Sequence, residues 1–143
     1  TNKQGLFLQT IYFPLVEFTK QKNNQSLDVF VSAPTYKVGN RPPLKYLDVS
    51  TTYNAAEKTL YVNVLNRSKD KDLTTRIENQ EGSLQNEVGV WEMNHPDLKA
   101  THTFGDDKKV RPVTRNFTAQ LENNGFNYTF PAHSLTILRL KLK

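Results

Sequence analysis

The chain has 143 residues, of which 36% are hydrophobic and 23% charged, and it contains no cysteine. A chain of this length forms one domain that buries roughly 68% of its unfolded surface, and the lack of cysteine excludes disulfides and thiolate metal sites. The formal net charge of +5 is spread along the chain, whereas nucleic-acid binding requires a clustered basic patch. No window is apolar enough for a membrane span. We therefore expect neither a nucleic acid nor a membrane as a partner.

The first notable stretch is "GLFLQTIYFPL" at residues 5–15, which contains no charge. An unbroken apolar run is typical of a strand buried on both faces or of the approach to a helix. Pro14 is tolerated in the first turn of a helix, where its missing N–H is not needed. We therefore predict a buried strand at residues 5–10 that passes into a helix ending near Lys22.

The predicted helix has an apolar stripe made by Ile11, Leu15 and Phe18, which follow the spacing i, i+4, i+7. We expect the segment either to fold this stripe against the domain that follows, through these three residues, or to pair with a second copy of the chain. The polar stretch "QKNNQS" then breaks the pattern and indicates a boundary between residues 1–23 and residues 24–143.

Most of the remaining chain alternates apolar and polar residues with a period of two, which is typical of half-buried strands. Prolines, glycines and polar runs separate these stretches, and residues 94–109 form a long polar loop. About seven or eight such strands predict an all-β fold, an antiparallel β-sandwich with a short N-terminal strand-helix segment. The stretches are residues 27–33, 46–53, 59–67, 73–79, 87–93, 113–121, 126–130 and 134–143.

An Asn-Gly pair at Asn124–Gly125 lies between two alternating stretches and is a strong hairpin signal. The alternation places Phe117 before this turn and Tyr128 after it on the inward side, with Arg115 interrupting the apolar side. A buried Tyr128 needs a partner for its hydroxyl, which the sequence does not identify.

The histidines and the polar loop give little support for a metal site or a catalytic triad. His133 lacks the nucleophile motif of a hydrolase and is interpreted as a turn residue between two strands. The spacing of the ligand-type residues in the loop fits neither a helical zinc pair nor a calcium loop. We therefore expect no bound metal and no cofactor. These residues are His95, Asp97, His102, Asp106 and Asp107.

Glycoside hydrolysis needs a facing pair of carboxylates, and nothing marks such a pair among Asp28, Asp48, Glu78 and Glu92. We therefore assign no catalytic residue to this chain. Trp91 in "VGVWEM" is either a sugar-stacking platform or a partly buried core or interface residue. A platform usually needs two or three exposed aromatic residues in line, so the core or interface interpretation is favoured.

The order of segments nevertheless resembles one family. "GLFLQTIYFPL", "YLDVSTTYN", "LYVNVLNRS", "THTFGDDKKVRP" and the closing "FNYTFPAHSLTILRLKL" together are similar to the C-terminal portion of the α-L-arabinofuranosidases of glycoside hydrolase family 51. One departure is His102, at a position where that family is expected to have asparagine.

The resemblance implies that residues 1–23 are the remnant of the last βα unit of a (β/α)₈ barrel and that residues 24–143 are the accessory β-sandwich. It places Gln9 where a glutamine contacts the arabinose ring, but only in the intact enzyme. Both catalytic carboxylates belong to earlier barrel strands, so the isolated chain is predicted to be inactive. The implied partner is the enzyme's own barrel, and a homo-oligomer is also allowed.

Two other interpretations stay open at this point. One is a stand-alone carbohydrate-binding module for arabinose-containing polysaccharides, which an aligned aromatic surface would favour. The other is a small enzyme, which a cleft with two facing carboxylates would favour. The sequence leaves the compartment open, and in a bacterium it would be the cytoplasm or the periplasm.

Overall fold

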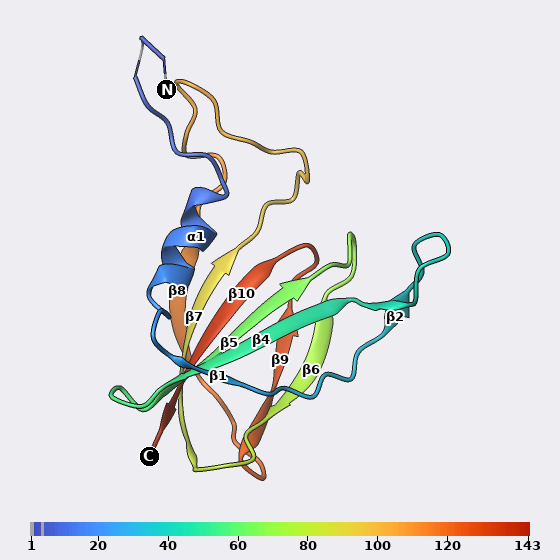
Figure 1. Cartoon of the computed structure of the whole chain (residues 1–143), viewed down its shortest axis with the longest axis vertical. Helices are drawn as coiled ribbons and strands as arrows, with labels where there is room; N and C mark the ends of the chain where they lie inside the picture. Colours follow the sequence, from blue (N-terminus) through green and yellow to red (C-terminus); the bar gives the residue numbers. More distant parts are fainter. Residues whose placement is uncertain (1, 4) are drawn as a thin grey trace.

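The computed structural model describes residues 2–3 and 5–143, which form one helix and a set of antiparallel strands (Figure 1). The largest sheet has the strand order β1-β4-β5-β10-β7-β8, and β6 pairs with β9 in a separate sheet. This arrangement confirms the predicted all-β, sandwich-like class. The strands of the large sheet are β1 (Gln25–Leu27), β4 (Leu47–Asn54), β5 (Thr59–Asn66), β7 (Leu84–Met93), β8 (Val113–Thr118) and β10 (Leu135–Leu142).

The sandwich core lies between the large sheet and the pair β6 (Leu73–Glu78) and β9 (Gly125–Phe130). In the centre of the large sheet Val62 on β5 lies opposite Leu138 on β10, which lies opposite Val90 on β7. These side chains pack with Phe126 and Phe130 of β9. On β5, β9 and β10 the period-two alternation therefore places one apolar side in this core, as predicted, whereas Val113 of β8 is 57% exposed. A separate small pair is formed by β2 (Thr35–Tyr36) and β3 (Leu44–Lys45).

The opposite face of the large sheet carries a second apolar cluster, formed by Tyr61, Trp91 and Ile137. Phe13 of the helix α1 (Tyr12–Thr19) packs against this cluster. Strand β5 is therefore buried on both faces along most of its length. In Figure 1, α1 lies on the side of the large sheet away from β6 and β9.

The N-terminal segment differs from the prediction. Residues 6–9 form no strand, and Leu6 is 69% exposed. A strand requires a neighbouring backbone for its ladder, and in the described part of the chain no strand pairs with these residues. The predicted helix is present but ends at Thr19 instead of near Lys22. Pro14 is its third residue, where no intrahelical N–H bond is lost.

The predicted strand at residues 27–33 is also wrong beyond its first residue. Strand β1 ends at Leu27, where its pairing with β4 stops. Val31 and Ala33 still pack against the core as coil, but Phe30 is 93% exposed. Alternation alone does not make a strand when the chain leaves the sheet edge.

The predicted hairpin between β8 and β9 is wrong in its pairing. Asn123 and Asn124 both have positive φ and form the turn between Glu122 and Gly125, one residue earlier than predicted. The strands on either side then diverge, because β8 pairs with β7 and β9 pairs with β6. The chain therefore crosses from one sheet to the other at this turn.

No helix in the described residues has the length and apolar character needed to cross a membrane.

Candidate functional site

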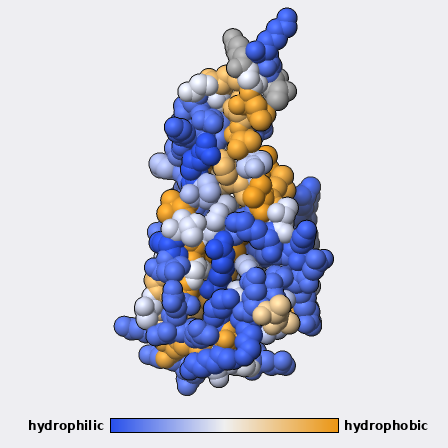
Figure 2. All heavy atoms as spheres, turned by 90° about the vertical axis from the view of Figure 1, so that its left-hand side faces the viewer, coloured by the Kyte–Doolittle hydropathy of each residue, from blue (hydrophilic) through white to orange (hydrophobic). Residues whose placement is uncertain are grey.

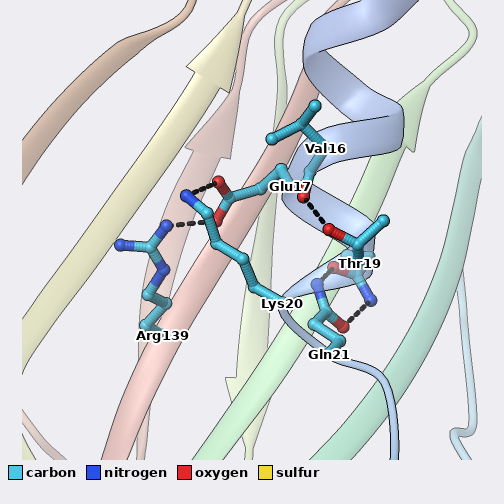
Figure 3. A network of polar contacts seen from close by, with 7 residues as sticks. Val16, Glu17, Thr19, Lys20, Gln21 and Arg139 are labelled. Carbon is cyan, nitrogen blue, oxygen red and sulfur yellow. Dashed lines mark hydrogen bonds and ion pairs between the residues drawn. The ribbon is translucent and has the colours of Figure 1, made fainter.

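Helix α1 faces the large sheet with a largely polar side. Phe13 and Glu17 follow the spacing i, i+4, which places them on one helical face, and Gln21 in the turn after the helix lies on the same side toward the sheet. The Glu17 side chain is only 3% exposed, and its carboxylate accepts hydrogen bonds from Arg139 on β10 and from Lys20, whose Nζ lies 2.6 Å from Oε2 (Figure 3). The burial of Glu17 is thus compensated by two cations.

The residues just after α1 are fixed by amide hydrogen bonds. The Gln21 Nε2 donates to Asn63 Oδ1 at 2.8 Å, and the Asn63 Nδ2 donates back to Gln21 Oε1 at 3.0 Å. The hydroxyl of Thr52 also donates to Gln21 Oε1, at 3.0 Å. Because Thr52 lies on β4 and Asn63 on β5, this network holds the C-terminal end of the helix on the sheet.

The predicted apolar stripe faces away from the sandwich. Ile11 is 60% exposed, Leu15 58% and Phe18 40%, so the expectation that they pack on the sandwich was wrong. The polar contacts of Glu17 and Gln21 occupy that side instead. With other exposed side chains nearby, the stripe forms what we call the apolar surface, seen in the upper half of Figure 2. It comprises Leu6, Ile11, Tyr12, Leu15, Val16 and Phe18.

The segment before α1 is held by the long loop between β7 and β8, which lies beside it in Figure 1. His102 in this loop is 3% exposed. Its Nδ1 lies 2.6 Å from the carbonyl oxygen of Leu8, and its Nε2 accepts the N–H of Val110 at 3.0 Å. A buried histidine of the loop therefore links the N-terminal segment to the sandwich.

Aromatic contacts reinforce this link. Phe104 packs edge-on against Phe7 with 4.7 Å between ring centroids. The guanidinium carbon of Arg111 lies 4.8 Å from the ring centre of Phe13, within cation–π range. Gln9, the predicted sugar-contacting residue, follows Leu8 directly and is exposed.

The other candidate ligand residues of the loop are engaged locally. The Nδ1 of His95 accepts the backbone N–H of Asp97 at 3.1 Å. In the described residues, no three side chains of the metal-ligating types converge on one point. His133 has a φ of 47° and lies in the turn between β9 and β10, which confirms its interpretation as a turn residue.

The four acidic residues considered for catalysis lie at separate places, and three of them are paired with arginine. Asp48 pairs with Arg67, Glu78 with Arg76 at 2.6 Å, and Glu92 with Arg115 at 3.1 Å. Asp28 is exposed on the coil after β1. The arrangement offers no facing pair among these four for hydrolysis of a glycosidic bond.

The single tryptophan is a core residue. Trp91 is 5% exposed and lies with Tyr61 and Ile137 under the helix, which confirms the core interpretation. A shallow pocket of about 310 Å³ on another part of the surface is lined by Asp72, Asn94, His95, Pro96, Ala132 and His133. Its one carboxylate, Asp72, accepts a hydrogen bond from the backbone N–H of Ala132 at 2.8 Å, which is a structural role.

The chain is similar to known proteins along nearly its whole length. The family model described as the α-L-arabinofuranosidase C-terminal domain matches residues 1–134. The chain belongs to this family. A probable α-L-arabinofuranosidase C from Aspergillus clavatus is 33% identical over 99% of the chain, and one from Aspergillus niger is 30% identical over 99%.

The chain spans 27% of the length of these two relatives. Solved structures agree with the fold. A family 51 arabinofuranosidase from Xanthomonas axonopodis pv. citri gives a TM-score of 0.85 at 18% identity, covering 99% of this chain and 28% of the other. An arabinose complex of the Thermotoga maritima α-L-arabinofuranosidase gives 0.83 at 21% identity, covering 99% and 31%.

Sequence reasoning missed how α1 is attached. A buried Glu17 within "PLVEFTK" and an Arg139 within the alternating strand β10 are the signals present in the sequence. Their pairing across 122 positions becomes visible only in the fold.

Proposed function

We propose that this chain is the accessory β-sandwich of a retaining α-L-arabinofuranosidase, with residues 1–23 as the last βα unit of its (β/α)₈ catalytic barrel. The enzyme would release terminal α-L-arabinofuranosyl residues from arabinan or arabinoxylan. The observation that carries this proposal is the exposed apolar surface on α1. The polar side of the helix contacts the sandwich, and its apolar side is exposed.

The two sides of α1 fit a helix placed between two domains. Its Phe13, Glu17 and Gln21 side contacts the sheet, and the apolar surface supplies the area that a barrel needs to cover. In barrel enzymes the site lies at the C-terminal ends of the strands. Residues 5–10 as the last barrel strand place Gln9 near that end, where it would contact the arabinose ring.

The structure gives less support to a carbohydrate-binding module. Such a module binds sugar rings on exposed aromatic side chains. Trp91, Tyr61 and Tyr128 are buried and offer no stacking platform. The exposed Tyr12 and Phe18 belong to the apolar surface that we assign to the barrel contact, and Phe30 is exposed on the coil after β1.

The test compares the isolated chain with the longer protein that contains it, using an aryl α-L-arabinofuranoside. We expect turnover with retained anomeric configuration from the longer protein and none from the isolated chain. Saturable turnover by the isolated chain that a single Asp or Glu substitution abolishes would contradict the proposal. So would binding of arabino-oligosaccharides to the isolated chain with a Kd at or below about 1 mM, followed by Trp91 fluorescence.

A further inference from the structure

The ring of His102 has a defined protonation pattern. The backbone N–H of Val110 can only donate, so the Nε2 that it contacts at 3.0 Å carries the lone pair. The proton of the neutral ring therefore lies on Nδ1, which donates to the carbonyl oxygen of Leu8 at 2.6 Å. His102 thus uses both ring nitrogens to join the loop to the N-terminal segment.

The hydrogen bond from His102 to the Leu8 carbonyl fixes the backbone directly before Gln9. On its other side, the Gln9 carbonyl accepts the N–H of Tyr12 at 3.0 Å, at the start of α1. The backbone of Gln9 is thus fixed by hydrogen bonds on both sides, although residues 6–9 lack a strand ladder. Its side chain stays exposed.

Packing around His102 supports a fixed rather than a mobile contact. The ring lies edge-on to Phe13 of α1, with 6.0 Å between ring centroids. Val110 is 6% exposed, and Phe104 packs on Phe7. Movement of the His102 ring would disturb the loop, the segment and the helix together.

We propose that His102 is a positioning residue for Gln9: it holds the Leu8 carbonyl and so sets where the Gln9 side chain meets the arabinose ring. This inference rests on the proposed function. It gives the sandwich a part in the sugar site, although the sandwich supplies no catalytic group. A misplacement of about 1 Å in a contacting group can cost up to about a hundredfold in rate.

Two substitutions test the hydrogen bonds of the two ring nitrogens separately. In His102→Asn the amide nitrogen takes the place of Nδ1 and still donates to Leu8, while the bond with Val110 is lost. In His102→Gln the amide oxygen takes the place of Nε2 and still accepts from Val110, while the bond with Leu8 is lost. Each variant loses one hydrogen bond, so a purely structural role for His102 predicts equal effects.

The first measurement is kcat/KM of the longer protein on an aryl α-L-arabinofuranoside, together with Tm. We expect His102→Gln to lower kcat/KM by about tenfold or more and His102→Asn to retain most of it, with similar losses in Tm. In a Gln9→Ala background, His102→Gln should cause no further loss, because the group that it positions is gone.

The second measurement uses the isolated chain and needs no activity. The ¹⁵N spectrum of the His102 ring should show the Nδ1–H tautomer, and the amide resonances of Leu8 and Gln9 should shift more in His102→Gln than in His102→Asn.

Equal kinetic losses in the two variants, or a full His102→Gln effect in the Gln9→Ala background, would overturn the inference. Inactive wild-type longer protein would instead overturn the proposed function and with it the role of Gln9. The ¹⁵N spectra would then still decide whether His102 holds Leu8.

Discussion

At the scale of single residues, Tyr128 shows how the charged side chain of Arg115 is accommodated beside the apolar core. The ring of Tyr128 packs on Phe117 and Phe130, with centroids 5.7 and 4.8 Å away. Its hydroxyl oxygen accepts a hydrogen bond from Arg115 at 2.9 Å. Arg115 also forms an ion pair with Glu92 at 3.1 Å. Arg115, which interrupts the apolar side of β8, therefore supplies the hydrogen-bond partner of the Tyr128 hydroxyl.

This environment raises the pKa of Tyr128 above its ordinary value of 10.0, chiefly through burial and to a lesser degree through Glu92, while Arg115 lowers it. A folded-state pKa above the unfolded one means that the folded chain retains a proton that the unfolded chain loses. The Tyr128 contribution to stability is therefore fully present below about pH 10 and is lost as pH rises further.

We expect Tyr128→Phe to lower the free energy of unfolding by about 1 kcal/mol at neutral pH, because one hydrogen bond is lost while the ring is kept. Above about pH 10 the difference from the wild type should shrink, because phenylalanine does not titrate. Urea unfolding from pH 7 to pH 11 measures this difference. A difference that grows with pH would contradict the assigned direction of the pKa shift.

At the scale of elements, helix α1 is attached by its polar side. The Glu17 carboxylate accepts hydrogen bonds from Arg139 and Lys20, and the Gln21 and Asn63 side chains form two hydrogen bonds with each other. Phe13 adds an apolar contact beside Trp91. Directional hydrogen bonds of this kind fix the rotation of a helix about its axis, whereas an apolar stripe alone would tolerate small rotations.

We expect Glu17→Ala to lower the free energy of unfolding by about 1–3 kcal/mol, because two charge-assisted hydrogen bonds are lost. The side chains of Arg139 and Lys20 are 31% and 57% exposed, so both cations can still reach water and the cost stays below that of a stranded buried charge. Urea unfolding followed by Trp91 fluorescence measures it. The matched control on the same helix is Leu15→Ser, which should change stability little; a larger loss in the control would show that the helix faces are assigned wrongly.

The alternation of polar and apolar residues predicted which side of β4, β5 and β10 faces the sandwich core, but it did not predict that β5 is buried on its other face as well. It did not predict pairing partners, because the turn at Asn123 and Asn124 looks the same whether the flanking strands pair or diverge. It also placed the wrong side of α1 on the sandwich. The helix contacts the sandwich through Phe13 and Glu17, and the spacing of its apolar residues does not indicate this side.

The candidate site was predictable only in part, for a related reason. The resemblance pointed to Gln9 from its position in "GLFLQT". The contact between His102 and Leu8 joins residues 94 positions apart, and no local pattern marks it. Long-range polar contacts depend on the topology, which the periodicity of a sequence does not specify.

At the scale of the whole molecule, the layers follow one another from the β6–β9 pair through the large sheet to α1 (Figure 1). The large sheet is the inner layer, and its central strand β5 is buried on both faces. The outermost layer, α1, ends in the apolar surface, which continues over the N-terminal segment (Figure 2). The lower part of the same face is mostly hydrophilic, so on this face the apolar surface lies in the part of the molecule that we assign to the barrel. Phe30 and Val113 are exposed outside that part.

The double substitution Leu15→Ser with Phe18→Ser tests this assignment by its dependence on context. In the isolated chain both side chains are largely exposed, so we expect almost no change in the free energy of unfolding and less self-association at high concentration. In the longer protein both should be buried against the barrel, at about 2 kcal/mol for each large apolar side chain. The Tm of the barrel should therefore fall in the double variant. Differential scanning calorimetry and sedimentation of both forms measure these effects. An equal effect in the two contexts would show that nothing covers this side of α1, and the placement of the barrel would be wrong.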